Sequence, residues 1–256
     1  MKDLGSKRNW YSPVAKIYYE ARPNYPQELI DLAIASTHLS SKSKILEIGC
    51  GAGNATVPFA RSNASITCIE HNREFCLQAR QNCQKFPKVK ICHCSFEGWQ
   101  LSDKYNAVLS ANAFYQLPQQ KSYAKAAAAL KDGGFIILLW NLTPELKYEV
   151  YQSVETIFQT YVPSLVRYEG RETQTAILKG FAQNTCNSGY FQNFVSQQIP
   201  CQVTYSVEQY LNLLSTLRRI NPKVQNMFFA ELREQLQQWR DIELSFLSAV
   251  HLAQKK

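Results

Sequence analysis

The chain has 256 residues, of which 45% are hydrophobic and 19% are charged, and these proportions exclude general disorder. The length suits one large α/β domain. No apolar run approaches the roughly 20 residues that cross a bilayer. Because no apolar segment follows the charged start of the sequence, we expect no secretory signal, no membrane partner and a cytoplasmic location.

The formal net charge is +8, from 28 basic and 20 acidic side chains. Such an excess favours anionic partners in general. Along the sequence, however, the basic residues are dispersed. The densest pairs are Arg218-Arg219 and Lys255-Lys256, and neither forms a basic stripe. We therefore interpret the charge mainly as a contribution to solubility and do not expect a nucleic-acid partner.

Eight cysteines are scattered along the chain, several of them inside apolar runs. Without an export signal, we expect reduced thiols that pack as small apolar residues. The tightest group is Cys92-His93-Cys94, which lacks the paired Cys-x2-4-Cys spacing of a zinc site. We therefore expect no metal.

Apolar, β-prone runs alternate with helical patterns from residue 28 to about residue 140. This alternation predicts βαβ crossovers and a parallel sheet covered by helices. The expected strands are 44–48, 64–70, 89–94, 105–111 and 135–140, and the expected helices are 27–39, 55–62, 73–83 and 119–130.

The pattern changes after Asn141. We expect a helix over 144–161, a strand over 190–205, helices over 206–217 and 223–239, and a last strand over 241–252. Ser206 and Gln209 have capping-box spacing, whereas 163–188 shows no clear pattern. Since no repeat or low-complexity linker is present, we expect one domain over 1–256, with 28–141 as its core and 142–256 as an elaboration.

A glycine-rich turn follows the first expected strand. Glu47, Gly49, Gly51 and Gly53 give the pattern E-x-G-x-G-x-G. Alternate glycines remove the Cβ atoms that would keep a ligand from the main chain, and they expose backbone N–H groups beside a helix start. The spacing differs from the G-x-G-x-x-G of dinucleotide-binding proteins, which disfavours a dehydrogenase.

Polar residues also end the next three expected strands. Glu70 ends the second strand, and its two oxygens match the cis-diol of a ribose; a solvated glutamate is the alternative. In Ser95-Phe96-Glu97-Gly98-Trp99, the polar and aromatic residues suit an adenine, or the aromatic residues cap the core. Asn112 to Tyr115 follow the fourth strand, at the carboxyl edge where open α/β sheets bind ligands.

Taken together, these segments resemble a class I S-adenosylmethionine-dependent methyltransferase over about residues 15–141. The resemblance implies a Rossmann-like, mostly parallel seven-stranded sheet with helices on both faces. It also implies S-adenosylmethionine as cofactor and S-adenosylhomocysteine as product. The segments, in family order, are ILEIGCGAGNAT, ITCIEHN, SFEGWQL, ANAFYQL and LKDGGFIILLWN.

The resemblance assigns roles to individual residues. The three glycines would lie along the methionine and ribose portion, and Glu47 would also belong to the cofactor site. Glu70 would bind the ribose hydroxyls, and His71 would flank the adenine. The adenine edge would meet Ser95, Phe96 and Glu97, and the sulfonium would lie above Asn112 and Ala113.

An upstream segment, Tyr18 to Pro26, resembles the Tyr-x-x-x-Arg-Pro-x-Tyr-Pro element of a subset similar to trans-aconitate-type and other small-molecule methyltransferases. In that subset the element folds over the cofactor. It implies an N-terminal lid over 1–27, with Tyr18 and Arg22 facing the methionine end and Arg22 pairing with its carboxylate. A surface arginine fixed by the following proline is the alternative.

The acceptor side is less determined. Relatives hold a His-Trp pair where this chain has Tyr115-Gln116, so a histidine base is not implied. We expect a small-molecule acceptor, with an organic acid as the hypothesis, and a C-terminal helical insertion that contributes to selectivity. The candidate acceptor-side residues are Phe114, Tyr115 (also the candidate catalytic residue), Trp140, Tyr210 and Arg218.

Two other functions remain open. A nucleic-acid methyltransferase that modifies amino groups would need an Asn/Asp-Pro-Pro-aromatic tetrad after the fourth strand, which is absent here. Methylation of cytosine at C5 would need a Pro-Cys nucleophile at that position, and Pro200-Cys201 lies far downstream of it. A catalytically silent protein that keeps the cofactor pocket is the second alternative. The sequence leaves a monomer and a homodimer equally open.

Overall fold

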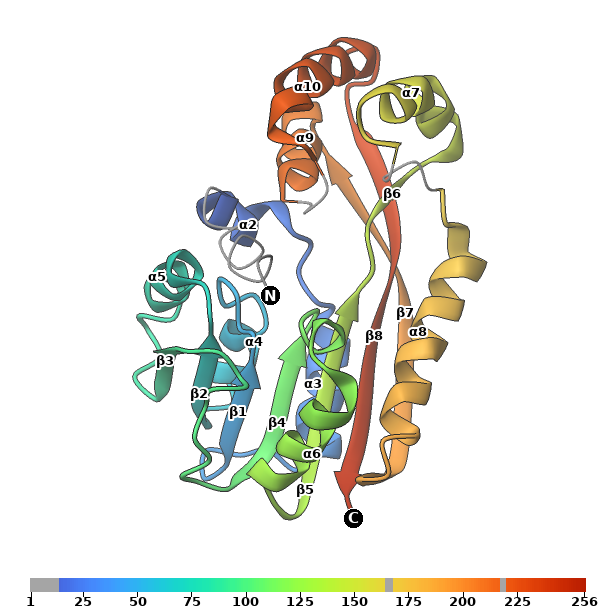
Figure 1. Ribbon diagram of the computed structural model, residues 1–256. Coiled ribbons are helices and arrows are strands. Elements are labelled where there is room, and N and C mark those ends of the chain that lie inside the picture. The colour runs from blue at the N-terminus through green and yellow to red at the C-terminus, as the bar shows by residue number, and fades with distance from the viewer. Residues whose placement is uncertain (1–13, 164–167, 217–219) are drawn as a thin grey trace.

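The computed structural model describes residues 14–163, 168–216 and 220–256. Its centre is an eight-stranded sheet in the order β3-β2-β1-β4-β5-β8-β6, with β7 pairing β8 (Figure 1). β1 to β5 are parallel, whereas β8 runs antiparallel to each of its neighbours. The strands are β1 (Lys44–Ile48), β2 (Ser65–Glu70), β3 (Val89–His93), β4 (Tyr105–Ala111), β5 (Leu130–Asn141), β6 (Glu145–Leu146), β7 (Phe191–Tyr205) and β8 (Ile242–Lys255).

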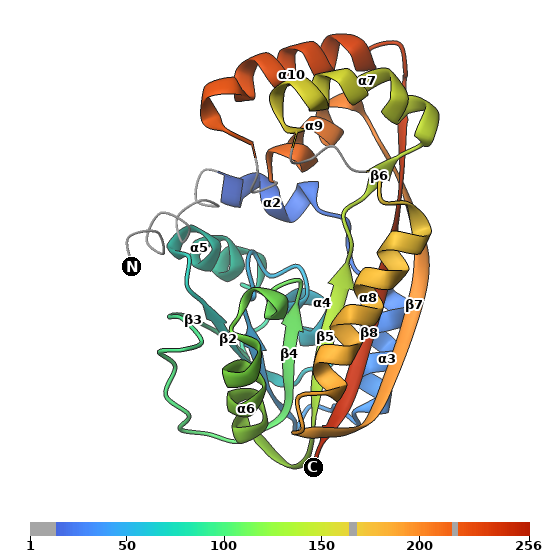
Figure 2. The ribbon, with the colours of Figure 1, turned by 45° about the vertical axis from the view of Figure 1, so that its right-hand side comes forward.

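Helices cover both faces of the sheet (Figures 1 and 2). One face packs on α3 (Gln27–Ser36), α4 (Thr56–Ala60) and α5 (Arg73–Asn82), and the other on α6 (Gln119–Ala129) and α8 (Gly170–Cys186). A third apolar cluster joins α7 (Tyr148–Tyr161), α9 (Val207–Ser215) and α10 (Pro222–Leu236) beyond one end of the sheet. The short α2 (Ala15–Ala21) lies between this cluster and α5.

The expected parallel, helix-covered sheet is confirmed, and strands 44–48 and 105–111 have the predicted bounds. The prediction of seven strands is wrong, because the described residues form eight. The additional strand is β6, whose Glu145 and Leu146 pair with Ser245 and Leu244. β8 has 14 residues and extends past β5, so it leaves a free edge on which this short strand pairs.

The region after Asn141 contains two further differences. The helix expected from residue 144 begins only at Tyr148, because β6 occupies the preceding residues. The long helix α8 lies in the segment without a clear pattern. Its buried residues include Gln174 and Thr185 beside Leu178, so polar side chains obscure the helical period. The Gln174 Oε1 atom accepts a hydrogen bond from the Leu247 N–H at 2.7 Å, which explains its burial.

No helix within the described residues is both long enough and apolar enough to cross a membrane.

His251 on β8 is a buried titratable group under α8. Its Nδ1 accepts a hydrogen bond from the Trp140 indole N–H at 3.0 Å, while its Nε2 has no partner among the described residues. Burial lowers the pKa of His251 from 6.5 to about 4. The imidazole is therefore neutral at neutral pH, with the proton on Nε2.

His251 makes the free energy of unfolding depend on pH. Between pH 6.5 and about 4 the unfolded chain binds a proton that the folded chain does not, so folding stability falls as pH falls through this window. Across this pH window, the free energy of unfolding of wild type is expected to fall by about 3 kcal/mol more than that of His251→Gln. Urea unfolding at several pH values measures this difference. His38→Asn, at an exposed histidine, is the matched control, and equal pH profiles for the two variants would contradict the assignment.

Candidate functional site

A cavity of about 300 Å³ lies at the carboxyl ends of β1, β2 and β4. β1 stands between β2 and β4, so the cavity is at the switch point where open α/β sheets bind ligands. Its volume is at the lower end of that of small-molecule sites. The lining residues are Tyr18, Tyr25, Ile48, Gly49, Cys50, Gly51, Asn54, Ala55, Ile69, Glu70, His71, Phe75, Cys94, Ser95, Phe96, Glu97, Ala111, Asn112, Ala113, Gln116 and Leu117.

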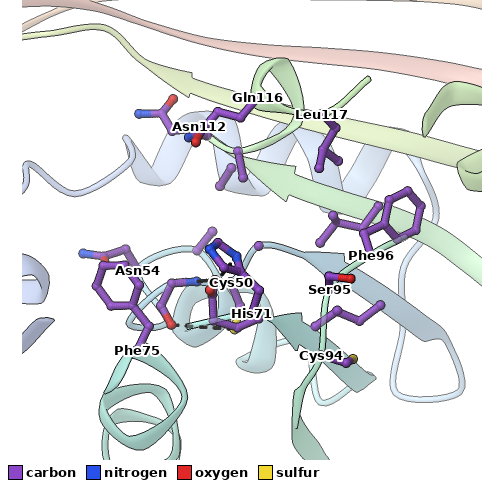
Figure 3. Close-up of a pocket in the computed structure, with 18 of the residues that line it drawn as sticks. Cys50, Asn54, His71, Phe75, Cys94, Ser95, Phe96, Asn112, Gln116 and Leu117 are labelled. Atoms are coloured by element: carbon purple, nitrogen blue, oxygen red, sulfur yellow. Dashed lines mark hydrogen bonds and ion pairs between the residues drawn. The ribbon is translucent and has the colours of Figure 1, made fainter. Parts of the chain in front are cut away.

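Figure 3 shows three groups of side chains around this cavity. Asn112, Gln116 and Leu117 come from the end of β4. They lie across from Cys50 and Asn54 of the glycine turn and from His71 and Phe75 beside it. A third group, 94–96, follows β3. The segments that follow β1, β2, β3 and β4 therefore enclose one space.

The glycine turn is shaped by a close approach between two loops. Gly49 has φ +68°, and a Cβ on it would lie 2.6 Å from the Cβ of Ala113. Gly51 has φ +55°, with no atom within 4 Å of its Cβ position, so the main chain is open to the cavity there. Gly53 does not line the cavity; its Cβ position faces the Cys83 sulfur at 3.4 Å. The three glycines thus serve different purposes.

Glu70 places a buried carboxylate in the cavity wall. Its Oε2 accepts a hydrogen bond from the Gly51 N–H at 3.1 Å, and its Oε1 accepts one from the Asn72 N–H at 2.7 Å. The His71 Nδ1 lies 3.2 Å from Oε1. Since each oxygen can accept more than one hydrogen bond, the carboxylate retains capacity for a ligand.

Glu47 lies below the turn and not on the cavity surface. Its side chain is fully buried, and its Oε2 accepts hydrogen bonds from the Thr56 hydroxyl at 2.7 Å and the Cys68 thiol at 3.6 Å. Its Oε1 has no partner among the described residues. Burial, with a smaller contribution from the charge of Glu70, raises the pKa of Glu47 to about 7, so the carboxyl is partly protonated at neutral pH.

Asn112 and Asn141 tie the ends of β4 and β5 together. Asn112 has φ +50°, and its amide group exchanges two hydrogen bonds with the backbone of Asn141, at 2.7 and 2.9 Å. The Asn141 Nδ2 donates to the carbonyls of Pro23 and Asn24, at 3.0 and 3.2 Å. The Ser248 hydroxyl donates to Asn141 Oδ1 at 2.6 Å. One asparagine therefore fixes β4, β8 and the segment 22–26 at the cavity rim.

The segment before α3 supplies two tyrosines to the cavity. Tyr18 packs edge-on against Phe75 at a centroid distance of 5.0 Å. Tyr25 is half-buried, and burial, with a smaller contribution from Tyr18, raises its pKa well above its usual value. The Asn54 Nδ2 donates to the Tyr19 carbonyl at 3.1 Å, which joins α2 to the glycine turn.

Arg22 lies behind this wall. Its guanidinium is 5.1 Å from the centre of the Tyr18 ring and donates to the Thr216 carbonyl at 3.2 Å. Its Nε is buried and has no hydrogen-bond partner among the described residues. Arg22 therefore contacts a cavity residue without lining the cavity.

The loop after β3 is held by Lys125 of α6. The Lys125 ammonium donates to the carbonyls of Glu97 and Trp99, at 3.0 and 2.6 Å, and lies 5.2 Å from the centre of the Phe96 ring. Phe96 both lines the cavity and belongs to the core cluster under α6. Its ring can therefore pack in the core and still face a ligand. Cys94, expected in the core, is half-buried and lines the cavity.

Most of the proposed cofactor residues line the cavity, whereas the described acceptor-side candidates do not. Arg22, Glu47 and Gly53 are the cofactor candidates that lie outside its surface. Phe114 and Trp140 are buried in the sheet core, and Tyr210 is buried among α7, α9 and α10. Tyr115 is 48% exposed and stacks on Phe181 at 5.5 Å. Arg218 lies outside the described residues.

Several lining residues escaped the sequence analysis. Tyr25 belongs to the Arg-Pro-x-Tyr-Pro segment, whose second tyrosine was the available signal. Asn54 directly follows the glycine turn, where its polar side chain was the available signal, and Gln116 enters the sequence argument only as a departure from relatives. The apolar Phe75 and Leu117 carry no signal of their own.

Residues 45–134 match the family described as a methyltransferase domain. The matched segment runs from β1 into β5 and contains the described cavity residues other than Tyr18 and Tyr25. No curated protein matches the chain. The domain supports an S-adenosylmethionine-dependent methyltransferase.

Solved structures share the fold at low sequence identity. A protein of Anaeromyxobacter dehalogenans, with a proposed type II methyltransferase assignment, has a TM-score of 0.62 and 15% identity over 91% of this chain and 97% of that chain. A phosphoethanolamine N-methyltransferase 2 of Haemonchus contortus, in complex with phosphomonomethylethanolamine and S-adenosylhomocysteine, has a TM-score of 0.57 and 12% identity over 100% of this chain and 61% of that chain. The tRNA methyltransferase TrmI of Aquifex aeolicus has a TM-score of 0.51 and 13% identity over 91% of this chain and 70% of that chain. The likeness shows the fold and leaves the acceptor open.

The close approach at the turn predicts different costs for two glycine substitutions. Gly49→Ala is expected to lower the free energy of unfolding by roughly 2–5 kcal/mol, because its Cβ meets Ala113 in a left-handed backbone. Gly51→Ala, with the same type of backbone and open space, is expected to cost only about 1 kcal/mol. Urea unfolding compares the two, and equal losses would contradict the account.

Proposed function

We propose that the cavity of this methyltransferase domain binds S-adenosylmethionine and that the chain transfers its methyl group to a small-molecule acceptor. The observation that carries the proposal is the juxtaposition of the open main chain at Gly51 with the buried carboxylate of Glu70, 3.1 Å from the Gly51 nitrogen. A nucleoside needs both features: close access to backbone and a paired acceptor for the ribose hydroxyls.

The remaining wall suits the other parts of this cofactor. Ser95, Phe96 and Glu97 offer hydroxyl, aromatic and carboxylate groups that would meet the adenine. At the β4 side, Asn112 and Ala113 would lie next to the sulfonium. The electron-rich rings of Tyr18 and Tyr25 also line the cavity and suit a positively charged ligand.

We extend the proposal to the segments around the core. Residues 1–27 would form a lid over the cofactor, of which 14–27 are described, and the insertion within 142–256 would face the acceptor. The support for the lid is its attachment at two points: Tyr19 to Asn54, and Pro23 with Asn24 to Asn141. The single-domain organisation, the cytoplasmic location and the monomeric or homodimeric state stay predictions.

When bound, S-adenosylmethionine supplies a methyl group that is already activated on a positively charged sulfur. The protein then has to hold the acceptor in line and exclude water. The segment 22–26, held by Asn141, and the Asn112–Asn141 pair fix the cavity rim, so these elements would set the direction from which the acceptor approaches. Burial raises the pKa of Tyr25, which keeps its phenol protonated at neutral pH and able to donate a hydrogen bond.

The described part of the cavity wall offers no lysine or arginine and no histidine apart from His71, which is paired with Glu70. An acceptor that is nucleophilic without losing a proton first, such as a carboxylate or a neutral amine, therefore suits the site better than one that needs a base. We propose an organic acid. Its support is Arg22, whose buried Nε has no hydrogen-bond partner among the described residues and whose guanidinium lies over the ring of the cavity residue Tyr18.

Calorimetric titration with S-adenosylhomocysteine tests the cofactor site. Wild type is expected to bind, and Glu70→Gln to bind about tenfold to hundredfold more weakly, because charge-assisted hydrogen bonds to the ribose are lost. Glu28→Gln, an exposed carboxyl on α3, is the matched control and should leave the affinity unchanged. Unfolding curves confirm that each variant folds. Absence of binding by wild type would contradict the proposal.

The acceptor class is tested in the same preparation with isotope-labelled S-adenosylmethionine and a panel of carboxylic acids, phenols and amines. Methyl ester formation that Arg22→Gln lowers at least about tenfold at saturating S-adenosylmethionine would support an organic acid, because saturation removes any effect of Arg22 on cofactor affinity. Turnover of amines or phenols without any acid would overturn that acceptor and keep the methyltransferase. Cofactor binding with no turnover on the whole panel would favour the catalytically silent alternative.

A further inference from the structure

The edge of the sheet opposite the cavity is formed by the amino ends of β1 to β5 and the carboxyl end of β8 (Figure 1). We call it the basic edge, because each of these strands brings basic residues to it. Lys85, Lys88 and Lys90 stand at the start of β3, and Arg61 in the turn before β2. All four side chains are exposed.

The row continues across the centre of the sheet. Lys42 and Lys44 lead into β1, Lys104 precedes β4, and Lys131 is the second residue of β5. All four are exposed. Lys44, Lys104 and Lys131 line one shallow pocket, so these lysines are spatial neighbours although 87 positions separate the first from the last.

Lys255 and Lys256 complete the row at the end of β8. Among the described residues of this edge, Asp103 and Asp132 are the only acids, and they pair with Lys44 and Lys255. Among the described residues, the edge thus holds ten basic side chains and two acidic ones. These side chains carry a formal charge of +8, which equals the net charge of the whole sequence.

The cations form a line rather than a cluster. They belong to the six neighbouring strands β3-β2-β1-β4-β5-β8, at least one to each. Five strand spacings of about 4.8 Å make a row about 24 Å long. The Lys88 ammonium donates to the carbonyls of Ser41 and Asn63, which brings three consecutive turns of the edge into contact. A linear array of positive charge matches a linear polyanion.

We propose that the basic edge binds the phosphate backbone of a nucleic acid without reading its sequence. Neutralising successive phosphates releases counterions and provides affinity that does not depend on base identity. A membrane surface fits less well, because peripheral proteins also insert an apolar face. The large apolar side chains that are exposed in the described turns of this edge are those of Leu101 and Tyr190.

The basic edge and the cavity occupy opposite ends of the same strands. β1 has five residues and β4 has seven, so about 15–23 Å separates the two ends. The phosphates that bind this edge would therefore lie away from the cavity, and the proposal concerns docking, not methyl transfer. This inference is independent of the proposed acceptor, since it would hold equally for a silent cofactor-binding protein.

Fluorescence anisotropy with a labelled oligouridylate of about 15 nucleotides, long enough to follow the row, tests the inference. The edge variant replaces Lys42, Lys90 and Lys131 by Gln. The matched control replaces Lys121, Lys179 and Lys223, which are equally exposed and lie elsewhere. Both variants lower the net charge by the same amount, and unfolding curves verify that both fold.

Wild type is expected to bind at low salt with an affinity that falls steeply between about 50 and 200 mM salt. The edge variant should bind at least about tenfold more weakly and reduce the slope of log affinity against log salt by about 2, the equivalent of three phosphate contacts. The control variant should match wild type. Equal losses in both variants, no binding by wild type, or binding to phosphatidylserine vesicles in place of RNA would overturn the inference.

Discussion

The asparagine pair at the ends of β4 and β5 is the contact on which the cavity depends. Asn112 adopts a left-handed backbone and holds Asn141 by two hydrogen bonds. Asn141 in turn holds β8 through Ser248 and the segment before α3 through two carbonyls. The segment that carries Tyr25 is thereby attached to the end of the sheet at the cavity rim. The amide groups of these two asparagines are hydrogen-bonded at both their oxygen and their nitrogen, and this network holds the cavity rim in place.

The structure separates two tasks along the length of the strands. At the carboxyl ends, loops distant in sequence meet around a cavity that, within the described part, is lined by the carboxyl groups of Glu70 and Glu97 and the imidazole of His71. At the amino ends, lysines extend into solvent. A ligand with a positively charged sulfur meets carboxylates and aromatic rings at one end, and a polyanion meets the basic edge at the other. The net charge therefore says nothing about the acceptor.

Local patterns predicted what depends on local sequence. Strands 44–48 and 105–111, the glycine turn and Glu70 all follow from apolar runs and adjacent polar residues. Contacts between distant segments were out of reach: the role of Asn141, the burial of Tyr210 and the helix α8, which buries glutamine and threonine. The basic edge was missed for the same reason, because each strand contributes only one to three cations and only the parallel sheet gathers them.

Hydrogen–deuterium exchange of the full chain, with and without S-adenosylhomocysteine, tests the central claim most directly. The account predicts slower exchange in 18–26, 49–54, 70–75, 94–97 and 112–117, the segments that enclose the cavity. It predicts no change at the basic edge, for example over 101–104 and 131–134. Slower exchange of the backbone amides of 18–26 would show that this segment covers the bound ligand. Unchanged exchange around the glycine turn, or protection confined to another region, would contradict the account.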